Sequence, residues 1–248
     1  MERSTVDMLR KLNTKFYETT GKEFDETRFY PWAGWEELYE KGVFNEKGLL
    51  NVLDLGCGNG RFAEFMKTKG VEYDYIGIDN DEGLLESAGS KLAEPNVNFL
   101  KGDILELDRL EQILPAMTTS RGFDLITLFG VMHHIPGNEL RIALLKWCRS
   151  HLTQNGMIIF SVWDFINDER FEKRLLDPTE LGIDISQLDV NDHILDWRKG
   201  EVAYRYCHHY PEDEINELLV NTGLKVIYDF KADGRSGMLN RYYVVGIG

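Results

Sequence analysis

The segment from Val52 to Gly60 constrains the fold of this chain more than any other. It reads Val-Leu-Asp-Leu-Gly-Cys-Gly-Asn-Gly: an apolar strand, then three glycines at alternate positions, with a helical pattern from Arg61. In a doubly wound α/β domain, such a loop brings the backbone close to a nucleotide-like ligand at the carboxyl end of the first strand. A Cβ at Gly56 or Gly58 would strike the ligand or forbid the turn. We also expect an anionic ligand group to face unpaired N–H groups at the start of the next helix.

Acidic residues follow the ends of successive predicted strands. Asp54 precedes the first glycine, Asp79 ends the apolar run 75–78, and Asp103 follows the run 97–100. An acid after the second strand suits two ribose hydroxyls, and one after the third suits an adenine amino group, because carboxylate oxygens accept hydrogen bonds. The alternative is that Asp79 and Asp103 only form turns. A dinucleotide fingerprint would place the third glycine one residue later, which disfavours a nicotinamide-dependent oxidoreductase.

The order of these strand ends resembles the class I methyltransferases that use S-adenosylmethionine. A fourth apolar run, 123–130, continues the series and leads into 131–136. The resemblance implies an α/β, doubly wound, Rossmann-like sheet of seven strands, mostly parallel with a C-terminal antiparallel strand. It also implies S-adenosylmethionine as cofactor and S-adenosylhomocysteine as product. The cofactor-binding residues implied are Asp54, Gly56, Gly58, Gly60, Asp79, Asn80, Asp103, Ile104 and Phe129.

The hydrophobic pattern indicates one domain, residues 1–248, built from four segments. These are an N-terminal helical extension on the substrate side (1–50), a cofactor-binding core (51–163), a lid insertion (164–210) and a C-terminal helix with a hairpin (211–248). The insertion is charged and lacks a regular pattern, so we expect it to be a partly ordered, substrate-binding segment above the carboxyl edge of the sheet.

Alternation of strands and helices in the core calls for a parallel sheet with helices on both faces. The helices expected are 4–19, 61–69, 82–93, 106–114, 138–152 and 212–222. The strands expected after the fourth are 157–163, entered through a turn at 154–156, and a closing antiparallel hairpin of 224–230 and 241–247.

Charge and cysteine usage exclude several classes of protein. The net charge of −14 over 248 residues favours solubility and opposes a large non-specific grip on nucleic acid. Cys57, Cys148 and Cys207 lack metal-ligand spacing, and an odd number argues against a disulfide framework. The amino terminus lacks the apolar core of a signal peptide, and no run reaches membrane-spanning length. We expect a cytoplasmic enzyme with no metal site and no membrane partner.

The chemistry of the acceptor decides which side chains the site needs. An amine or hydroxyl acceptor calls for a base, and His133 or His134 is placed for that role after the fourth strand. A carboxylate is already ionised at neutral pH, so it needs a guanidinium and aromatic faces instead. Arg28 and Arg205 each lie among aromatic residues, which favours a carboxylate. The alternatives are a packed turn around Arg28 and a structural histidine pair.

Two outlying segments resemble a narrower family, the tRNA wobble-uridine carboxymethyl methyltransferases. They are 27–32, Thr-Arg-Phe-Tyr-Pro-Trp, and 204–208, Tyr-Arg-Tyr-Cys-His. Further similarities are the His133–His134 pair, and Arg141, Leu152, Gly156 and 161–163, which resemble the final parallel strand of that family and the residues before it.

That family esterifies the carboxylate of 5-carboxymethyluridine in a tRNA anticodon and works with a small zinc-ribbon activator protein. The resemblance implies that Arg28 and Arg205 hold the substrate carboxylate or a neighbouring phosphate, while Trp32 and His133 shape the pocket. Cys207 stands where the family has an aromatic residue, and the acidity of the chain is unusual for a tRNA enzyme. The alternatives are a small-molecule O- or N-methyltransferase and a binding protein that has kept the fold without turnover.

Overall fold

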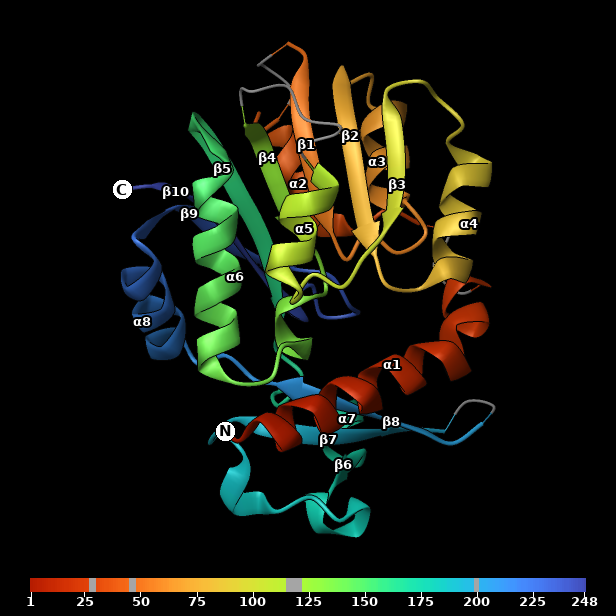
Figure 1. Ribbon diagram of the computed structural model, residues 1–248, viewed down its shortest axis with the longest axis vertical. Coiled ribbons are helices and arrows are strands. Elements are labelled where there is room, and N and C mark those ends of the chain that lie inside the picture. Colours follow the sequence, from red (N-terminus) through yellow and green to blue (C-terminus); the bar gives the residue numbers. More distant parts are fainter. Residues whose placement is uncertain (27–29, 45–47, 115–121, 199–200) are drawn as a thin grey trace.

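A seven-stranded sheet of order β3-β2-β1-β4-β5-β10-β9 forms the centre of the fold (Figure 1). The computed structural model describes residues 1–26, 30–44, 48–114, 122–198 and 201–248. Neighbouring strands pair in parallel, except that β10 is antiparallel to both β5 and β9. The predicted doubly wound fold is therefore confirmed. Its strands are β1 (Leu50–Leu55), β2 (Tyr73–Asp79), β3 (Val97–Lys101), β4 (Phe123–Leu128), β5 (Leu152–Trp163), β9 (Leu224–Ala232) and β10 (Asn240–Ile247).

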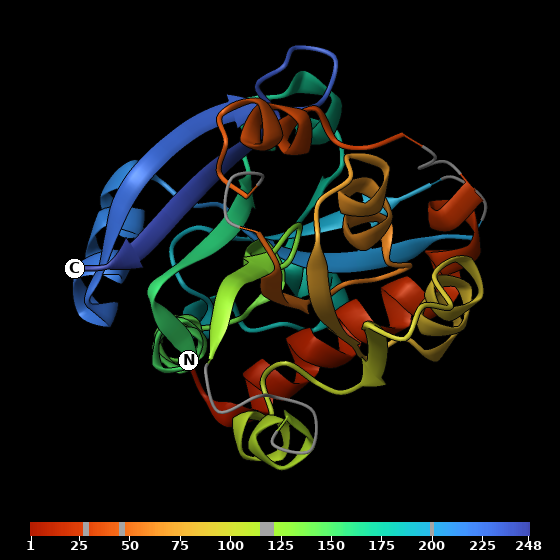
Figure 2. The ribbon, with the colours of Figure 1, turned by 90° about the horizontal axis from the view of Figure 1, so that it is seen from above.

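Helices cover both faces of this sheet because each face buries an apolar cluster. Trp35 and Phe62 belong to the cluster on one face, under α2 and α3, and Leu110, Leu144 and Leu218 to the other, under α5, α6 and α8. Figure 2 shows the twist of the sheet from above, with β9 and β10 forming one edge. The helices are α2 (Ala33–Glu40), α3 (Arg61–Thr68), α4 (Glu82–Lys91), α5 (Leu107–Ile113), α6 (Asn138–Ser150) and α8 (Glu212–Thr222). None of the helices within the described ranges is long and apolar enough to cross a membrane.

The fifth strand differs from the prediction. β5 begins at Leu152, so residues 154–156 lie inside the strand and do not form a turn before it. The pairing of β4 with β5 is irregular between Phe123 and Leu125. A Cβ on Gly156 would come within 2.6 Å of the Phe123 carbonyl oxygen, so the glycine permits a close approach of two strands.

The N-terminal helix, α1 (Arg3–Glu26), is longer than predicted and lies across the carboxyl edge of the sheet (Figure 1). Its apolar side chains Leu9 and Phe16 are buried, with exposures of 0% and 1%. Leu9 packs with Ile194 and Tyr206 of the insertion. Helix α1 and the insertion therefore share an apolar cluster of their own, outside the two faces of the main sheet.

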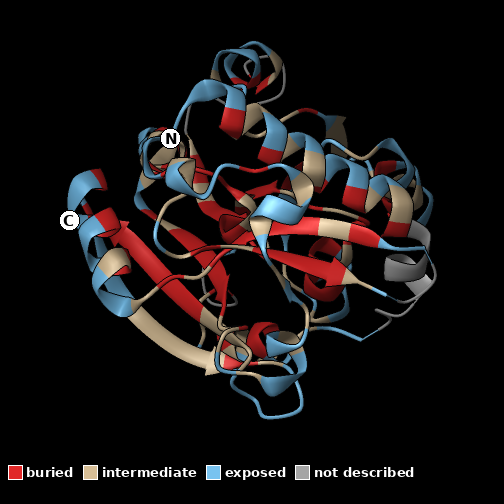
Figure 3. Ribbon diagram, turned by 90° about the horizontal axis from the view of Figure 1, so that it is seen from below, coloured by how far each residue is buried: buried red, intermediate tan, exposed pale blue. Residues whose placement is uncertain are grey.

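The insertion is more regular than the sequence pattern predicts. It holds a second, antiparallel sheet of order β6-β7-β8, and the middle residues of β7 and β8 are buried (Figure 3). Its elements are α7 (Glu169–Glu172), β6 (Leu175–Leu176), the 3-10 turns Pro178–Leu181 and Ile185–Gln187, β7 (Asp192–Trp197) and β8 (Ala203–His208). The charged composition of the insertion does not indicate these short strands, because much of the apolar surface on which they pack belongs to α1.

A buried charged network anchors the insertion to the core. Arg141 of α6 is 1% exposed and lies 3.4 Å from Asp192 of β7 and 3.2 Å from Glu214 of α8. His208 of β8 bridges the same two carboxylates, at 2.7 Å from Asp192 and 2.6 Å from Glu214. Burial favours the neutral acids, but the hydrogen bonds from His208 and the charge of Arg141 hold the pKa of both carboxyls below its usual value.

Candidate functional site

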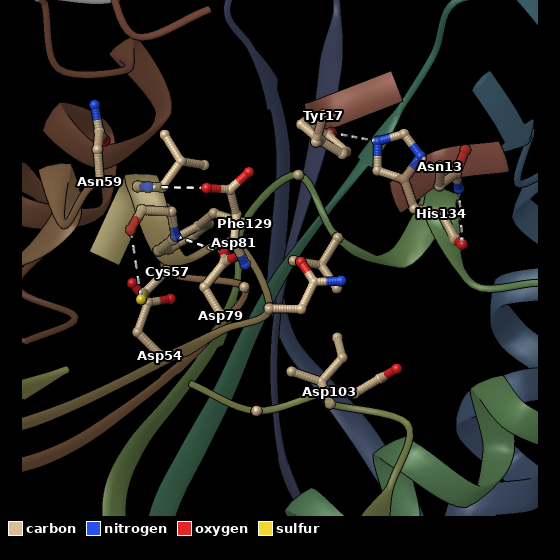
Figure 4. Close-up of a pocket in the computed structure, with 18 of the residues that line it drawn as sticks. Asn13, Tyr17, Asp54, Cys57, Asn59, Asp79, Asp81, Asp103, Phe129 and His134 are labelled. Carbon is tan, nitrogen blue, oxygen red and sulfur yellow. Dashed lines mark hydrogen bonds between the residues drawn. The ribbon is translucent and has the colours of Figure 1, made fainter. Parts of the chain in front are cut away.

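The carboxyl ends of β1 to β4 converge on a cavity of about 250 Å³, here called the strand-end cavity (Figure 4). A cavity of this size holds an organic ligand rather than a few waters. The predicted cofactor-binding residues that line it are Asp54, Gly56, Gly58, Asp79, Asn80, Asp103, Ile104 and Phe129. The topology explains the convergence, because parallel strands end at the same edge of the sheet.

The glycine loop serves two purposes. A Cβ on Gly58 would meet no atom closer than 4.0 Å and would extend from the wall of the cavity, so this glycine keeps space for a ligand. Gly60 is not among the lining residues; a Cβ there would lie 2.9 Å from Phe99 and 3.0 Å from Ala88. Gly60 therefore permits close packing of the loop on its neighbours, which differs from the predicted ligand contact.

Three N–H groups of the loop bind to the end of β2. The N–H groups of Gly56 and Cys57 donate to the Ile78 carbonyl at 2.8 and 3.1 Å, and that of Gly58 donates to the Asp79 carboxylate at 2.8 Å. These donors do not face a ligand. They fix the loop to the end of β2. The predicted ligand contact with unpaired N–H groups at the start of the next helix concerns α3, which begins at Arg61, and it stays a prediction.

Asp54 is a buried acid at the floor of the cavity. Its carboxylate accepts hydrogen bonds from the Tyr75 hydroxyl at 2.5 Å and the Thr127 hydroxyl at 2.7 Å. Burial raises the pKa of Asp54 to about 6, and the negative charge of Asp79 acts in the same direction. An ionised Asp54 is thus costly without a nearby positive charge, which suits a cationic ligand in the cavity.

Asp79 and Asp103 are held by the surrounding chain. Asp79 accepts hydrogen bonds from the N–H groups of Gly58 and Asp81, and burial raises its pKa. Asp103 accepts from the Leu105 N–H at 2.9 Å and forms an ion pair with Arg10 of α1. Each carboxylate oxygen can accept more than one hydrogen bond, so both acids retain capacity for ligand donors.

One face of α1 completes the strand-end cavity, which the sequence pattern did not reveal. Arg10, Asn13, Thr14 and Tyr17 line the cavity and follow helical spacing. The polar residues of an amphipathic helix normally face solvent, so composition gives no signal that this stripe faces a ligand site. Only the packing of Leu9 and its neighbours on the insertion turns the stripe toward the sheet.

A second, adjoining cavity, here called the aromatic cavity, lies between α1, the insertion and the hairpin. Trp32, Trp163, Phe171, Trp197, His133 and Arg205 are among its lining residues. Of the residues that the structure describes, Tyr17, Trp32, Gly130 and His134 line both cavities. These four mark the place where the two cavities meet.

Arg205 is the most unusual residue of the aromatic cavity. It is only 7% exposed, and its guanidinium lies 4.4 Å from the ring centre of Trp163 and 5.1 Å from that of Phe16. In the described part of the chain it forms no ion pair, and its buried Nε has no hydrogen-bond partner. A buried cation in this state costs free energy unless an anion joins it.

The other predicted acceptor-site residues separate into three cases. Trp32 stacks on Trp35 with ring centres 5.2 Å apart, and His133 lies 5.5 Å from Trp163 in the aromatic cavity. His134 is held within the protein, with Nε2 2.8 Å from the Tyr17 hydroxyl and Nδ1 3.0 Å from the Tyr206 carbonyl. Arg28 lies outside the described residues.

Metal chemistry finds no support among the described residues. No group of three or more His, Cys, Asp or Glu side chains there could hold a metal ion. Cys57, Cys148 and Cys207 are free and buried, and burial raises the pKa of each thiol.

Comparison with known sequences gives a consistent picture. A family model described as a methyltransferase domain matches residues 24–229. A protein of Encephalitozoon cuniculi, described as a candidate methyltransferase, is 28% identical over 214 residues, which cover 86% of this chain and 87% of the relative. The tRNA (carboxymethyluridine(34)-5-O)-methyltransferase of Saccharomyces cerevisiae is 28% identical over 151 residues, covering 60% of this chain but only 47% of that enzyme.

Solved structures agree on the fold. An S-adenosylmethionine-dependent methyltransferase from Clostridium acetobutylicum superposes with a TM-score of 0.62 over 95% of this chain and 98% of its own, at 18% identity. A protein from Pyrococcus horikoshii gives a TM-score of 0.60 over 86% of this chain and 89% of its own, at 18% identity. At these identities the likeness is one of fold.

Proposed function

The chain belongs to the methyltransferase-domain family and is an S-adenosylmethionine-dependent methyltransferase; from this premise we propose that it methylates a carboxylate. The observation that carries the proposal is Arg205, a buried guanidinium without a carboxylate partner in the described part of the chain, beside the strand-end cavity. Of the common acceptors, a carboxylate matches a guanidinium in both charge and bidentate geometry.

The strand-end cavity fits the methyl donor. Asp79 would hold the ribose hydroxyls, Asp103 the adenine amino group, and Asp54 the positively charged methionine portion, while Gly58 leaves space for the ligand. When bound, S-adenosylmethionine supplies a methyl group on a positively charged sulfur. The chain's own contribution is to orient that ligand and to exclude water.

The aromatic cavity would hold the acceptor. Arg205 pairs with the carboxylate, while Trp32 and Trp163 stack against the remainder of the molecule. One carboxylate oxygen forms a bond to the methyl carbon as the carbon–sulfur bond breaks, and the electron pair of that bond stays on sulfur. No proton moves, so the reaction needs no base, and His133 would serve only to shape the cavity.

The product of this reaction identifies the acceptor. A methyl ester releases methanol in mild alkali, whereas a methyl ether or a methylated amine does not. The protein is incubated with labelled S-adenosylmethionine and either cellular tRNA that carries carboxymethyluridine or a small-metabolite fraction, and the alkali-labile volatile label is measured. Alkali-stable label in every fraction would contradict a carboxylate acceptor.

A tRNA acceptor is supported by two features. The yeast relative acts on carboxymethyluridine at position 34 of tRNA, as its name states. Arginines also lie over aromatic walls of the cavity: Arg170 is 5.3 Å from the ring of Phe171, and Arg174 is 6.0 Å from that of Trp197. Arg170 is already paired with Asp168, so Arg174 would supply the positive charge for a phosphate at the rim, despite the net charge of −14.

A small-molecule acceptor is the second candidate, and the acidity of the chain favours it. Two results separate the candidates. With tRNA, the KM for the acceptor should rise steeply with salt, and a small zinc-ribbon partner protein should increase the rate. Label found in the metabolite fraction alone would favour the small molecule.

Asp79→Ala is expected to weaken S-adenosylmethionine binding by roughly 10- to 100-fold, because hydrogen bonds to a charged acceptor are lost. The same variant also removes the acceptor of the Gly58 N–H. A control must therefore separate a lost contact with the ribose from a disordered loop. Calorimetry with a cofactor analogue that lacks one ribose hydroxyl provides it. The analogue should lose much affinity in the unmodified protein and little in the variant. An equal loss in both proteins would show that Asp79 does not hold the ribose.

The affinity for S-adenosylmethionine should fall as pH drops through about 6, the pKa of Asp54. A cationic ligand favours the ionised carboxylate of Asp54. Near pH 6 part of Asp54 is protonated, so binding should release that proton. Well below this pKa, the affinity should fall by about tenfold per pH unit, because binding is linked to the ionisation of one carboxyl group. Calorimetry in buffers of different ionisation enthalpy measures the proton release. Asp54→Asn should abolish it, and proton release retained in that variant would assign the effect to another group.

A further inference from the structure

Asp54 is held from both sides by hydroxyl groups of the neighbouring strands. Strand β1, which carries Asp54, lies between β2 and β4 in the sheet. The Tyr75 hydroxyl of β2 donates to one carboxylate oxygen at 2.5 Å, and the Thr127 hydroxyl of β4 donates to the other at 2.7 Å. Both hydrogen bonds are closed to solvent, because Asp54, Tyr75 and Thr127 are 2%, 1% and 0% exposed. Each oxygen of the carboxylate therefore has a donor from the protein itself.

The register of the sheet lets the phenol of Tyr75 reach this carboxylate. Thr127 stands directly opposite Asp54 in the pairing of β1 with β4, whereas Gly77 has that place in the pairing of β1 with β2. A Cβ on Gly77 would lie 2.9 Å from the ring of Tyr75, which is two residues earlier on the same face of β2. Because Gly77 has no side chain, the Tyr75 ring has the space to extend to Asp54.

The two hydroxyls favour the ionised form of this buried acid. Both donate to the oxygens that bear the charge, so a protonated Asp54 would force one of them to turn away or to accept instead. Burial raises the pKa of Asp54, and the hydrogen bonds from Tyr75 and Thr127 oppose this rise. The negative charge of Asp79 raises the pKa further, to a net value of about 6. The Cys57 thiol also lies beside Asp54, and its raised pKa keeps it neutral (Figure 4).

We infer that Tyr75 and Thr127 are positioning residues for the cofactor, which keep Asp54 ionised and oriented toward the cationic methionine portion of S-adenosylmethionine. Asp54 lines the strand-end cavity, but Tyr75 and Thr127 do not, so both act through Asp54. Each carboxylate oxygen has more than one lone pair and can accept from a hydroxyl and from the ligand together. The inference rests on the placement of the methionine portion beside Asp54 under the proposed function, and it holds for any acceptor.

Tyr75→Phe removes one donor and keeps the ring, so the pH at which S-adenosylmethionine affinity is half lost should rise by about one unit. The affinity should then fall by about fivefold at about pH 6 and about tenfold at about pH 5, with almost no change at about pH 8. Thr127→Val should shift the profile in the same direction, whereas Thr127→Ser, which keeps a hydroxyl, should follow the unmodified protein. Calorimetry over this pH range measures the affinities without any acceptor.

Two controls separate this role from packing. Tyr73→Phe removes another buried hydroxyl of β2, one that donates to the Ala63 carbonyl at 3.0 Å, and it should leave the pH profile unchanged. The second control is a ligand, 5′-methylthioadenosine, which keeps the nucleoside but has no charged methionine portion. Its affinity should change by less than about twofold in Tyr75→Phe throughout the pH range.

Three results would overturn the inference. The first is an equal loss of both ligands in Tyr75→Phe, or a loss of S-adenosylmethionine affinity that does not vary with pH, since either would assign Tyr75 to packing. The second is a further loss when Tyr75→Phe is added to Asp54→Asn, which would mean that the hydroxyl acts through another group. The third is a flat pH profile in the unmodified protein, which would refute the placement of the methionine portion beside Asp54 as well. The carboxylate proposal is tested separately, because no acceptor is present.

Discussion

Arg205→Met is expected to lower kcat/KM for methyl transfer by about a hundred- to a thousandfold while leaving thermal stability unchanged or higher. The loss follows because a guanidinium–carboxylate pair contributes two charge-assisted hydrogen bonds, which methionine cannot make. The stability follows because a buried cation without a partner is replaced by an apolar side chain that packs on Trp163 and Phe16. Initial rates at subsaturating acceptor and a thermal unfolding scan measure the two effects.

Two further variants sharpen this result. Arg205→Lys keeps the charge but loses the planar fork and its stacking, so its activity should lie between those of the methionine variant and the unmodified protein. Arg241→Met makes the same change of charge at a residue that pairs with Asp229 and Glu212 and lines neither cavity, and it should leave the rate unchanged. Full activity in Arg205→Met would remove the basis for a carboxylate acceptor, and a large loss of stability would show that Arg205 serves packing.

Arg141→Met is expected to lower the free energy of unfolding by about 3–5 kcal/mol at neutral pH. The variant leaves the carboxylates of Asp192 and Glu214 in a buried site without the guanidinium that lies 3.4 and 3.2 Å from them. It also removes a donor to the Ile135 carbonyl. Urea unfolding of the intact chain measures the change, and Arg170→Met, at an exposed ion pair, should cost well under 1 kcal/mol.

The effect of Arg141 should depend on pH. Asp192 and Glu214 have lowered pKa values in the folded chain. Their ionised carboxylates therefore stabilise the folded state fully above about pH 4.5, and this contribution is lost as the pH falls through the lowered pKa values. Without Arg141 those pKa values rise, so the difference between the two proteins should narrow in acid. A difference that stays constant down to about pH 3 would show that the guanidinium acts through packing and not through these charges.

The sheet and the cofactor side of the site could be predicted from sequence because their signals are local. Asp54, Asp79 and Asp103 each follow an apolar run directly, and parallel strands bring such ends together without further information. Gly58 lines the strand-end cavity, and its contact with a ligand stays a prediction, whereas Gly60 packs on Phe99 and Ala88. A single sequence cannot separate these two cases, because close packing and a ligand contact both call for glycine.

The N-terminal helix was expected on the substrate side, but the α1 residues that line the two cavities could not be predicted, because their placement depends on contacts between distant segments. Asn13 faces the strand-end cavity only because α1 packs on β8. The hydrogen bond between Asn13 and Tyr206 that joins them links residues 193 positions apart in the chain. The small sheet of the insertion likewise depends on contacts with α1, which is distant in the sequence. Arg205 was singled out by its aromatic neighbours in sequence, but its lack of an ionic partner is a property of the folded chain alone.

The two cavities are built from different kinds of segment. The strand-end cavity draws on the loops after four neighbouring strands and on one face of α1, whereas the insertion and the β9–β10 connection, in the part of the chain that the structure describes, line the aromatic cavity alone. Exchange of these peripheral segments during evolution would therefore change which molecule is modified while the donor side is inherited intact. The same division gives protein engineers a natural boundary for grafting a new acceptor specificity onto this scaffold.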